Sequence, residues 1–517
     1  MGKYSLKKMA LIACALLLIF IVGCESVGGR NINQLILKQL EVEKLEQSQF
    51  IEVDIDYNEN QLNEEDAKTA QMMKWFEKTS LEITHSKIDG KGSMWVKGVF
   101  TFSKGSIPFT LHADSKTVRL DVEGVSRPLI LDIHSVMRSP LPGLMPPVHN
   151  AGAQDALVKS ARQLIRNVAP YFVNALPNPP VISVEPATEN VNGVSTSLTK
   201  VHAELNGEQL GELIPIYLDR LIQDKEGFRS MLRTVVQWAM DLPPEMKEIF
   251  DTGFEEEKNI EAYVDEGMAE LWPMLEDAQK ELKDMRQDDE WKEIFDKGIT
   301  LTTDLYFDDQ MYLRKSAMQL KIAPAAFARE DFPVRQITVR TRGEMWNVNG
   351  DVAVPAVDVP ANALNFEEMG SMQPFKILGM MDKQSVIYNI LKNDLQVDDQ
   401  SFTLSSEWGV PFYQDKKGVA YVPIRSTMDE FGVALSTSAR KGEIRFYDEA
   451  TGQKFLFLIG SQKAFVDGKA VKLSYKVTVD KHFTYIAAPD LFRLLKAEYK
   501  VTKSADGGLR MTVTRDL

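Results

Sequence analysis

Residues 50–57, Phe-Ile-Glu-Val-Asp-Ile-Asp-Tyr, decide the fold because apolar and acidic side chains alternate along them. This period of two is typical of a strand with one face buried and the other in water. Further strand patterns follow, separated by short turns rich in glycine, lysine and serine. The predicted strands cover residues 81–88, 92–103, 107–113, 118–122 and 129–133. Because such turns cannot contain crossover helices, we predict an antiparallel meander.

Helical patterns then replace the strands before strands resume. Helices are predicted at 63–76, 153–176 and 211–240, and in the last of these apolar residues recur at intervals of three and four. An acidic tract at 245–295 is interpreted as a helix with a solvated face. Further strands are predicted at 194–205, 300–307, 311–322 and 334–342. This order predicts an α+β domain over residues 48–370, in which one curved antiparallel sheet wraps the helices.

The N-terminus has the pattern of a bacterial lipoprotein signal. Three lysines precede an apolar run over residues 9–22, which is of signal-peptide length and short for a membrane span. The ending Ile21-Val22-Gly23-Cys24 resembles the lipobox of bacterial lipoproteins. That resemblance implies signal cleavage between Gly23 and Cys24 and lipidation of Cys24, with residues 24–47 as a tether. The alternative, an uncleaved N-terminal membrane helix, places the rest of the chain on the same side.

The lipobox resemblance implies a location at the cell membrane, anchored by lipid on the extracytoplasmic face, in a Gram-positive bacterium. The chain has 517 residues and a formal net charge of −14, which would become −17 once the three signal lysines are removed. An acidic protein of this kind is a poor partner for nucleic acid, because binding phosphates requires clustered Lys and Arg. The expected partner is therefore the membrane, reached through the lipid on Cys24.

No motif in the sequence indicates an enzyme, a cofactor or a metal site. Of the two cysteines, Cys14 would leave with the signal and Cys24 would carry lipid, so no thiol would remain. The six histidines show no metal-ligand spacing, and hydrolase motifs and phosphate-binding loops are absent. His112 and Asp114 could hold a metal between them, but we favour a strand-end histidine beside a turn aspartate. We predict a non-enzymatic protein without cofactors or metals.

The C-terminal part, residues 399–517, follows a predicted linker helix within 371–398 and contains an internal duplication of strand, short helix and hairpin. The segment Tyr421-Val422-Pro423-Ile424-Arg425 and the segment Ile459-Gly460-Ser461, with Gly468 after it, carry a family resemblance. They resemble the copper amine oxidase N-terminal-domain-like family, also called the stalk domain. The second copy departs from the family pattern, with Ala487 and Pro489 in place of proline and arginine.

Each motif residue also has a structural interpretation. Pro423 would end a strand and begin a helix, Arg425 would donate hydrogen bonds to loop carbonyls, and Gly468 would allow a turn with positive φ. The family name invites a copper interpretation. However, the stalk domain lies outside the catalytic core of such oxidases, and the histidine pattern of a copper site is missing.

Two functional hypotheses remain open. The first is a binding or scaffold lipoprotein of the cell envelope, whose C-terminal module contacts cell wall or an envelope protein. The second is a carrier of an apolar or lipid ligand in the larger domain, whose order of elements resembles that of the periplasmic lipoprotein-carrier superfamily. Its candidate lining residues, which alternatively fill a core, are Trp75, Trp95, Phe100, Phe102, Phe109, Trp238 and Trp346. The sequence predicts neither the ligand nor the oligomeric state.

Overall fold

The chain folds into two compact units. A computed structural model describes residues 26–27, 29–59, 67–133, 151–242, 259–328, 333–372, 374–395, 397, 400–407, 411–438, 442–480, 483–503 and 508–515. The larger unit takes its described residues from Met1–Glu123 and Arg127–Phe366, and the smaller unit from Gly124–Ser126 and Glu367–Leu517. The predicted signal peptide and Cys24 lie outside the described residues. No helix of the described chain is both long and apolar enough to cross a membrane.

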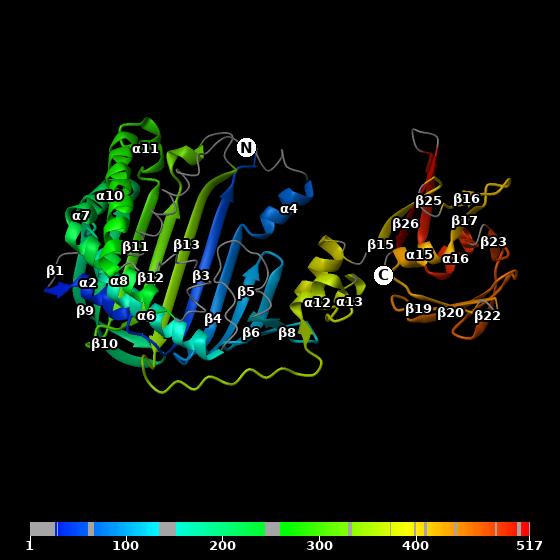
Figure 1. Cartoon of the computed structure of the whole chain (residues 1–517), viewed down its shortest axis with the longest axis horizontal. Coiled ribbons are helices and arrows are strands. Elements are labelled where there is room, and N and C mark those ends of the chain that lie inside the picture. The colour runs from blue at the N-terminus through cyan, green and yellow to red at the C-terminus, as the bar shows by residue number, and fades with distance from the viewer. Residues whose placement is uncertain are drawn as a thin grey trace. The chain divides into compact units, whose positions relative to one another are not determined.

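In its described residues, the larger unit is built on one curved sheet of twelve strands, in the order β14-β8-β7-β6-β5-β4-β3-β13-β12-β11-β10-β9 (Figure 1). The strands are β3 (Leu45–Tyr57), β4 (Lys78–Ile88), β5 (Met94–Phe102), β6 (Gly105–Ala113), β7 (Thr117–Val122), β8 (Leu129–Asp132), β9 (Val181–Val191), β10 (Val194–Asn206), β11 (Ile299–Phe307), β12 (Leu313–Ile322), β13 (Val334–Trp346) and β14 (Leu364–Asn365). Strand β14 pairs parallel to β8, and the other neighbours pair antiparallel. The α+β class and the predicted meander over β3–β8 are confirmed.

The described helices of this unit are α2 (Ile32–Gln39), α4 (Ala67–Trp75), α6 (Ala151–Asn174), α7 (Gly207–Gln223), α8 (Lys225–Met240), α10 (Ile260–Met285) and α11 (Asp289–Ile294), with a 3₁₀ turn at Ala325–Ala328. Most of them lie over the part of the sheet formed by β9–β13, whereas α4 lies near the ends of β4 and β5 (Figure 1). Leu210 of α7, Trp291 of α11 and Phe295, which directly follows α11, form one buried cluster with Leu301 and Leu320 of the sheet. This cluster identifies the concave, helix-facing side of the sheet.

Two predicted elements differ from the structure. The helix predicted over residues 211–240 is interrupted at Asp224, whose ψ of 65° is not helical and whose carboxylate accepts a hydrogen bond from the Gly227 amide, 2.8 Å away. Asp224 thus caps a second helix, α8. Strand β9 was not predicted, because Pro186 and flanking acids weaken its apolar pattern.

The boundaries predicted for the tether and the linker are also wrong. Strand β3 begins at Leu45, and Ile32 and Leu35 of α2 are buried against Val201 and Phe307 of the sheet, so most of the predicted tether belongs to the larger unit. The linker is not one helix. It forms α12 (Phe366–Ser371), α13 (Pro374–Leu378), α14 (Val386–Asn389) and a π-helical turn at Ile390–Asp394.

The described part of the smaller unit contains three small sheets around one apolar core. Their strand orders are β15-β26-β25, β16-β17-β24-β23 and β18-β19-β20-β21-β22. The strands are β15 (Gln400–Ser405), β16 (Tyr413–Gln414), β17 (Ala420–Pro423), β18 (Leu435–Ser438), β19 (Glu443–Asp448), β20 (Gln453–Leu458), β21 (Lys463–Val466), β22 (Lys469–Lys472), β23 (Thr478–Asp480), β24 (Phe483–Ala487), β25 (Glu498–Lys503) and β26 (Leu509–Arg515). Helices α15 (Ile424–Glu430) and α16 (Ala488–Leu494) contribute Met428 and Leu491 to the core.

The two halves of this unit repeat one arrangement. Strand β17 leads into α15 and the β18–β19 hairpin, and β24 leads into α16 and the β25–β26 hairpin. The repeats meet where β17 pairs antiparallel with β24, with Tyr421 opposite Ala487. Pro423 and Ala487 occupy the same place, each as the N-cap of its helix. The predicted duplication of strand, short helix and hairpin therefore matches the observed arrangement.

Candidate functional site

The concave side of β4–β8 carries an apolar surface that differs from the helix-covered part of the sheet. Val339, which packs against the helix cluster, pairs with Val53 of β3, and the same side continues through Leu81 of β4 to Phe100 of β5. Paired residues in a sheet share a face, and alternate residues along a strand share it too. The residues that we call the open concave face are Leu81, Ile83, Val96, Phe100, Ile107, Phe109, Leu111, Val118 and Leu120.

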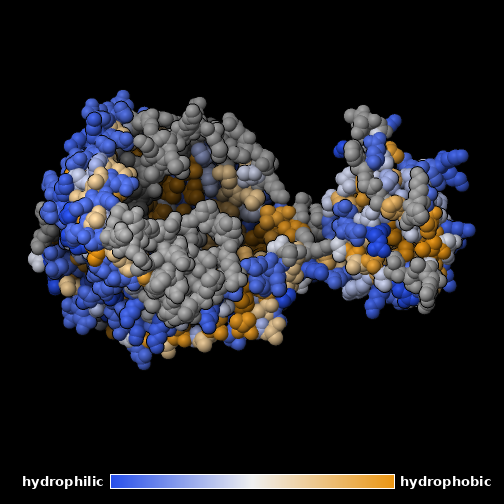
Figure 2. Space-filling model, in the orientation of Figure 1, coloured by the Kyte–Doolittle hydropathy of each residue, from blue (hydrophilic) through white to orange (hydrophobic). Residues whose placement is uncertain are grey.

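All of these side chains are half-buried, whereas Leu301 and Leu320 under the helices are 4% and 6% exposed. The larger unit is visibly hollowed, with apolar side chains inside the hollow (Figure 2). Contiguous apolar surface of this kind is typical of a binding site rather than of the surface of a monomer. The open concave face is therefore the first candidate site.

The surface has a local sequence basis at Gly98. A Cβ atom at this position would lie 2.7 Å from the Glu82 carbonyl oxygen and 2.8 Å from the Cζ atom of Phe109. Glycine therefore lets the Phe109 ring lie close over the backbone of β5. Farther along β5, Phe102 stacks on Phe100 and on Phe76, with ring centroids 5.5 and 5.7 Å apart. An aromatic cluster thus occupies the β5–β6 turn end of the face.

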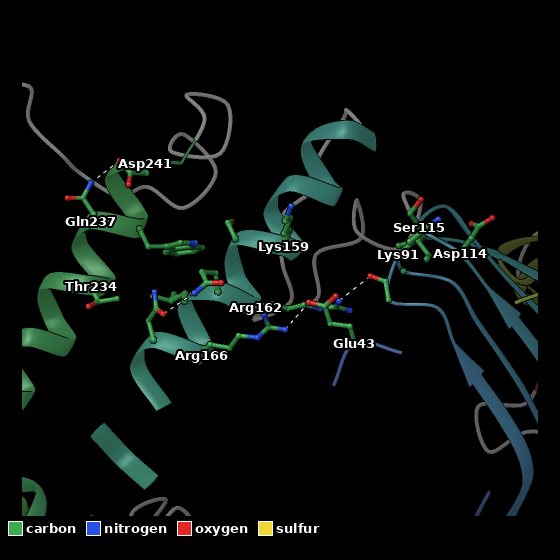
Figure 3. Close-up of a pocket in the computed structure, with 18 of the residues that line it drawn as sticks. Glu43, Lys91, Asp114, Ser115, Lys159, Arg162, Arg166, Thr234, Gln237 and Asp241 are labelled. Carbon is green, nitrogen blue, oxygen red and sulfur yellow. Dashed lines mark hydrogen bonds and ion pairs between the residues drawn. The ribbon is translucent and has the colours of Figure 1, made fainter. Parts of the chain in front are cut away.

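At the opposite end lies a cavity of about 1330 Å³ between α6, α8 and the turns that join β4 to β5 and β6 to β7 (Figure 3). We call it the helix–hairpin cavity. Its charged lining residues are Glu43, Lys91, Asp114, Lys159, Arg162, Arg166, Arg233 and Asp241. Ile133, Leu164 and Trp238 add apolar surface. The cavity is thus amphipathic, and five of its eight charged residues are cationic.

Two of the cavity's arginines have carboxylate partners. The Arg166 guanidinium donates a hydrogen bond to Glu43 over 2.9 Å, which lowers the pKa of the Glu43 carboxyl. Arg233 is bonded to Glu261, outside the lining. Arg162 instead donates to the Gly90 carbonyl oxygen over 3.2 Å.

Three cationic groups of the cavity wall are not held in ion pairs, although the charge of Arg162 acts on Glu43 as well. Within the described part of the chain, Lys91, Lys159 and Arg162 form no ion pair with a carboxylate. The sequence analysis missed this site, although Lys159, Arg162 and Arg166 recur at intervals of three and four. That spacing places them on one face of α6.

The aromatic residues predicted to line a ligand cavity do not all lie on the same side of the sheet. Phe100, Phe102 and Phe109 lie on the concave side, and Trp238 lines the helix–hairpin cavity. Trp95 and Trp346 lie on the convex side, where Trp95 pairs with His112 and Trp346 with Glu46. These two tryptophans cannot contact a ligand in the hollow. Trp75 is 7% exposed and lies under the ammonium group of Lys104.

The candidate metal pair does not form. His112 lies in β6 and Asp114 in the turn that follows it, where the Asp114 carboxylate accepts hydrogen bonds from the amides of Lys116 and Thr117, both over 2.8 Å. Burial lowers the pKa of the His112 imidazole. Among the described residues, no three His, Cys, Asp or Glu side chains are grouped so that they could hold a metal ion.

The motif residues of the smaller unit are structural in part. Asp467 and Gly468, with φ of 49° and 78°, form the turn between β21 and β22, as expected for a two-residue hairpin. Gly460 also has a positive φ, of 80°. Val422 and Pro423 are buried. Arg425 is exposed, and its guanidinium makes none of the predicted bonds to carbonyls in the described chain.

Tyr421 belongs to a cluster of four tyrosines that the sequence analysis did not identify. Its ring stacks on Tyr413, with centroids 5.3 Å apart and planes at 9°. Tyr485 and Tyr475 contact this pair edge-on, at 5.1 Å from Tyr413 and 6.1 Å from Tyr421. Tyr413 is 36% exposed, so one ring of the cluster faces solvent.

Comparison with known proteins assigns no family, because no protein-family model matches the chain and no curated protein matches it.

Proposed function

We propose that this protein is a lipid-anchored, extracytoplasmic binding protein whose larger unit carries an apolar or lipid ligand on the open concave face. The observation that carries the proposal is the contrast in burial along one side of one sheet. Fully burying a Leu, Ile or Phe side chain stabilises a protein by roughly 1.5–3 kcal/mol. A surface of nine half-buried apolar side chains therefore favours a ligand that covers it.

The proposed role is binding and not catalysis. The surface that supports it consists of hydrocarbon and aromatic side chains, which bind apolar ligands mainly by excluding water. The acidic composition of the chain is a further reason to propose no nucleic-acid partner.

The binding role is tested by making the same substitution, valine to asparagine, at one position on each face of β5. Val96 points to the concave side and Val99 to the convex side, and both side chains are half-buried. The probe is Nile red, an uncharged dye that fluoresces in apolar surroundings. We expect the wild-type protein and Val99→Asn to enhance its fluorescence equally, and Val96→Asn to weaken binding several-fold. Failure of the wild-type protein to bind, or an equal loss in both variants, would exclude an apolar site on the concave side.

The proposed anchor is tested separately at Cys24. Replacing it by alanine removes the thiol that would accept lipid, so the protein should move from the membrane fraction to the medium. Retention of Cys24→Ala in the membrane with an uncut signal would contradict the anchor and would leave the binding test unaffected.

A second proposed role concerns the smaller unit, which we suggest contacts cell wall or an envelope protein. The exposed, stacked ring of Tyr413 supports this role, because aromatic rings are enriched at contact surfaces. The test is co-sedimentation of the whole protein with purified cell wall. Tyr413→Ala should reduce pelleting, and Tyr447→Ala, at an exposed position of β19, should not. Equal pelleting of both variants would remove the tyrosine cluster as the contact.

A further inference from the structure

We infer that the helix–hairpin cavity holds the anionic headgroup of an amphiphile whose apolar chains lie on the open concave face. The inference rests on the proposed function for the apolar part of the ligand and adds the charge and orientation of that ligand. It identifies the ligand class as a lipid with a negatively charged headgroup.

The first argument is charge. Lys91, Lys159 and Arg162 line one cavity and form no ion pair with a carboxylate among the described residues, although the charge of Arg162 also acts on Glu43. The whole chain, by contrast, carries a formal net charge of −14. A local group of cations in a concave wall concentrates positive potential there, even when the protein as a whole repels anions. An anionic group is therefore the complementary occupant.

The second argument is position. The cavity is lined by Gly90 and Gly92, from the turn between β4 and β5, and by Asp114, which directly follows the last residue of β6. These turns end the strands that carry the open concave face. The Phe76–Phe102 aromatic pair lies at the other end of β5. A ligand with its headgroup in the cavity would therefore have its chains parallel to β5, pointing towards the Phe76–Phe102 pair.

The third argument is size. Strand β5 has nine residues and spans roughly 26 Å, at about 3.3 Å per residue. One leaflet of a bilayer has a hydrocarbon thickness of about 15 Å, half of the whole core. The face is thus long enough for the acyl chains of a membrane lipid. The cavity, at about 1330 Å³, has room for a headgroup and for the first part of the chains.

The apolar part of the cavity wall distinguishes a lipid from a free anion. Trp238, Ile133 and Leu164 share the cavity with the cations. A free phosphate would gain nothing from these side chains, whereas the glycerol and upper chains of a lipid would bury them. The amphipathic wall therefore favours an amphiphile over inorganic phosphate.

The experiment measures lipid transfer from vesicles. Protein lacking residues 1–24, which retains every described residue, is incubated with vesicles of phosphatidylglycerol or of phosphatidylcholine with identical acyl chains. The vesicles are removed by sedimentation, and the lipid left with the protein is quantified. We expect a preference of roughly ten-fold or more for phosphatidylglycerol, since each cation near an anionic lipid surface contributes about 1 kcal/mol.

The decisive variant replaces Lys91, Lys159 and Arg162 by glutamine together. It should bind phosphatidylcholine as the wild-type protein does and lose the preference for phosphatidylglycerol. The matched control replaces Lys280, Lys283 and Arg286, at the end of α10, by glutamine. These residues are exposed, lie outside the cavity lining and carry the same total charge, so the control should keep the preference.

Each outcome has a distinct meaning. Equal binding of both lipids by the wild-type protein would contradict the inference that the headgroup is anionic and would leave the proposed function intact. Equal loss of the preference in both triple variants would assign it to overall charge and overturn the site. Absence of any bound lipid would overturn the proposed function as well. Inorganic phosphate is titrated as a separate probe. Binding of phosphate without any binding of lipid would identify a site for free anions and contradict the inference that the ligand is an amphiphile.

Discussion

Replacing Arg515 by methionine should unfold the smaller unit at a markedly lower temperature. The side chains of Arg515 and Asp448 are 0% exposed, and Nη1 of Arg515 lies 2.8 Å from Oδ2 of Asp448. Nε of Arg515 donates to Oε1 of Gln400 over 2.8 Å, and the guanidinium lies 4.5 Å from the centre of the Phe431 ring. Thr451 donates to the same carboxylate over 2.7 Å. The ion pair is therefore held in a complete network inside the core.

The magnitude follows from what the substitution leaves behind. Methionine fills much of the volume but leaves the Asp448 carboxylate buried and without its counter-ion, a change that costs about 3–5 kcal/mol. The smaller unit has about 150 residues, and in a domain of this size each kcal/mol lowers the melting temperature by about 2–4 °C. The expected decrease is therefore about 6–20 °C. Adding Asp448→Leu should recover part of it, because the unpaired charge is then gone.

Differential scanning calorimetry of the whole protein measures the effect, with the transition of the larger unit as an internal reference. The matched control is Arg510→Met, which makes the same change at an exposed position of the same strand, β26. It should change the stability by no more than about 0.5 kcal/mol. The reasoning is refuted if both variants lower the melting temperature by the same small amount.

The remaining predictions concern the larger unit. The hydrogen bond from Arg233 lowers the pKa of the Glu261 carboxyl to about 2. The pKa of Glu261 in the folded protein is below its value of about 4.3 in the unfolded chain, so ionised Glu261 stabilises the fold above pH 4.3, and this stabilisation is lost as the pH falls towards 2. NMR titration of the Glu261 carboxyl in the wild-type protein and in Arg233→Gln measures the two pKa values. Gly207→Ala should destabilise the protein by about 1–3 kcal/mol, because its Cβ would lie 2.2 Å from the Asp296 carbonyl oxygen. Gly267 lies inside α10, and a Cβ atom there would be 3.6 Å from the nearest atom, Cδ1 of Leu232. Gly267→Ala should therefore stabilise the protein by about 0.4–1 kcal/mol, and the free energies of unfolding in denaturant distinguish the two variants.

Local pattern predicted the strands well because each one has a buried and a more polar side. Residues 50–57 lie inside β3, and the turns between β4 and β7 fall at the predicted segments around residues 90–92, 104–106 and 114–116. The errors have physical causes that lie outside a local window. The boundary before β3 was placed too late because the burial of Ile32 and Leu35 depends on strands far along the chain.

The candidate site was only partly predictable for the same reason. The aromatic residues were visible in the sequence, but whether one lines the hollow depends on strand register, which placed Phe100 and Trp95 on opposite faces of β5. The cations of the cavity come from a hairpin turn and a helix that only the folded chain brings together. The spacing within α6 indicated a cationic helix face, and nothing local indicated what that face would adjoin.

The pairing of β3 with β13 at the middle of the sheet also constrains how the protein is made. Arg340 and Glu52, joined across these strands, are 288 positions apart in the chain. Native contacts between segments so distant form slowly, and synthesis delivers the early strands long before their partner. The apolar strands β4–β8 therefore have to wait, with one sheet edge unpaired, until β13 emerges. A folding helper that shields such an edge would raise the yield of this protein most in that interval.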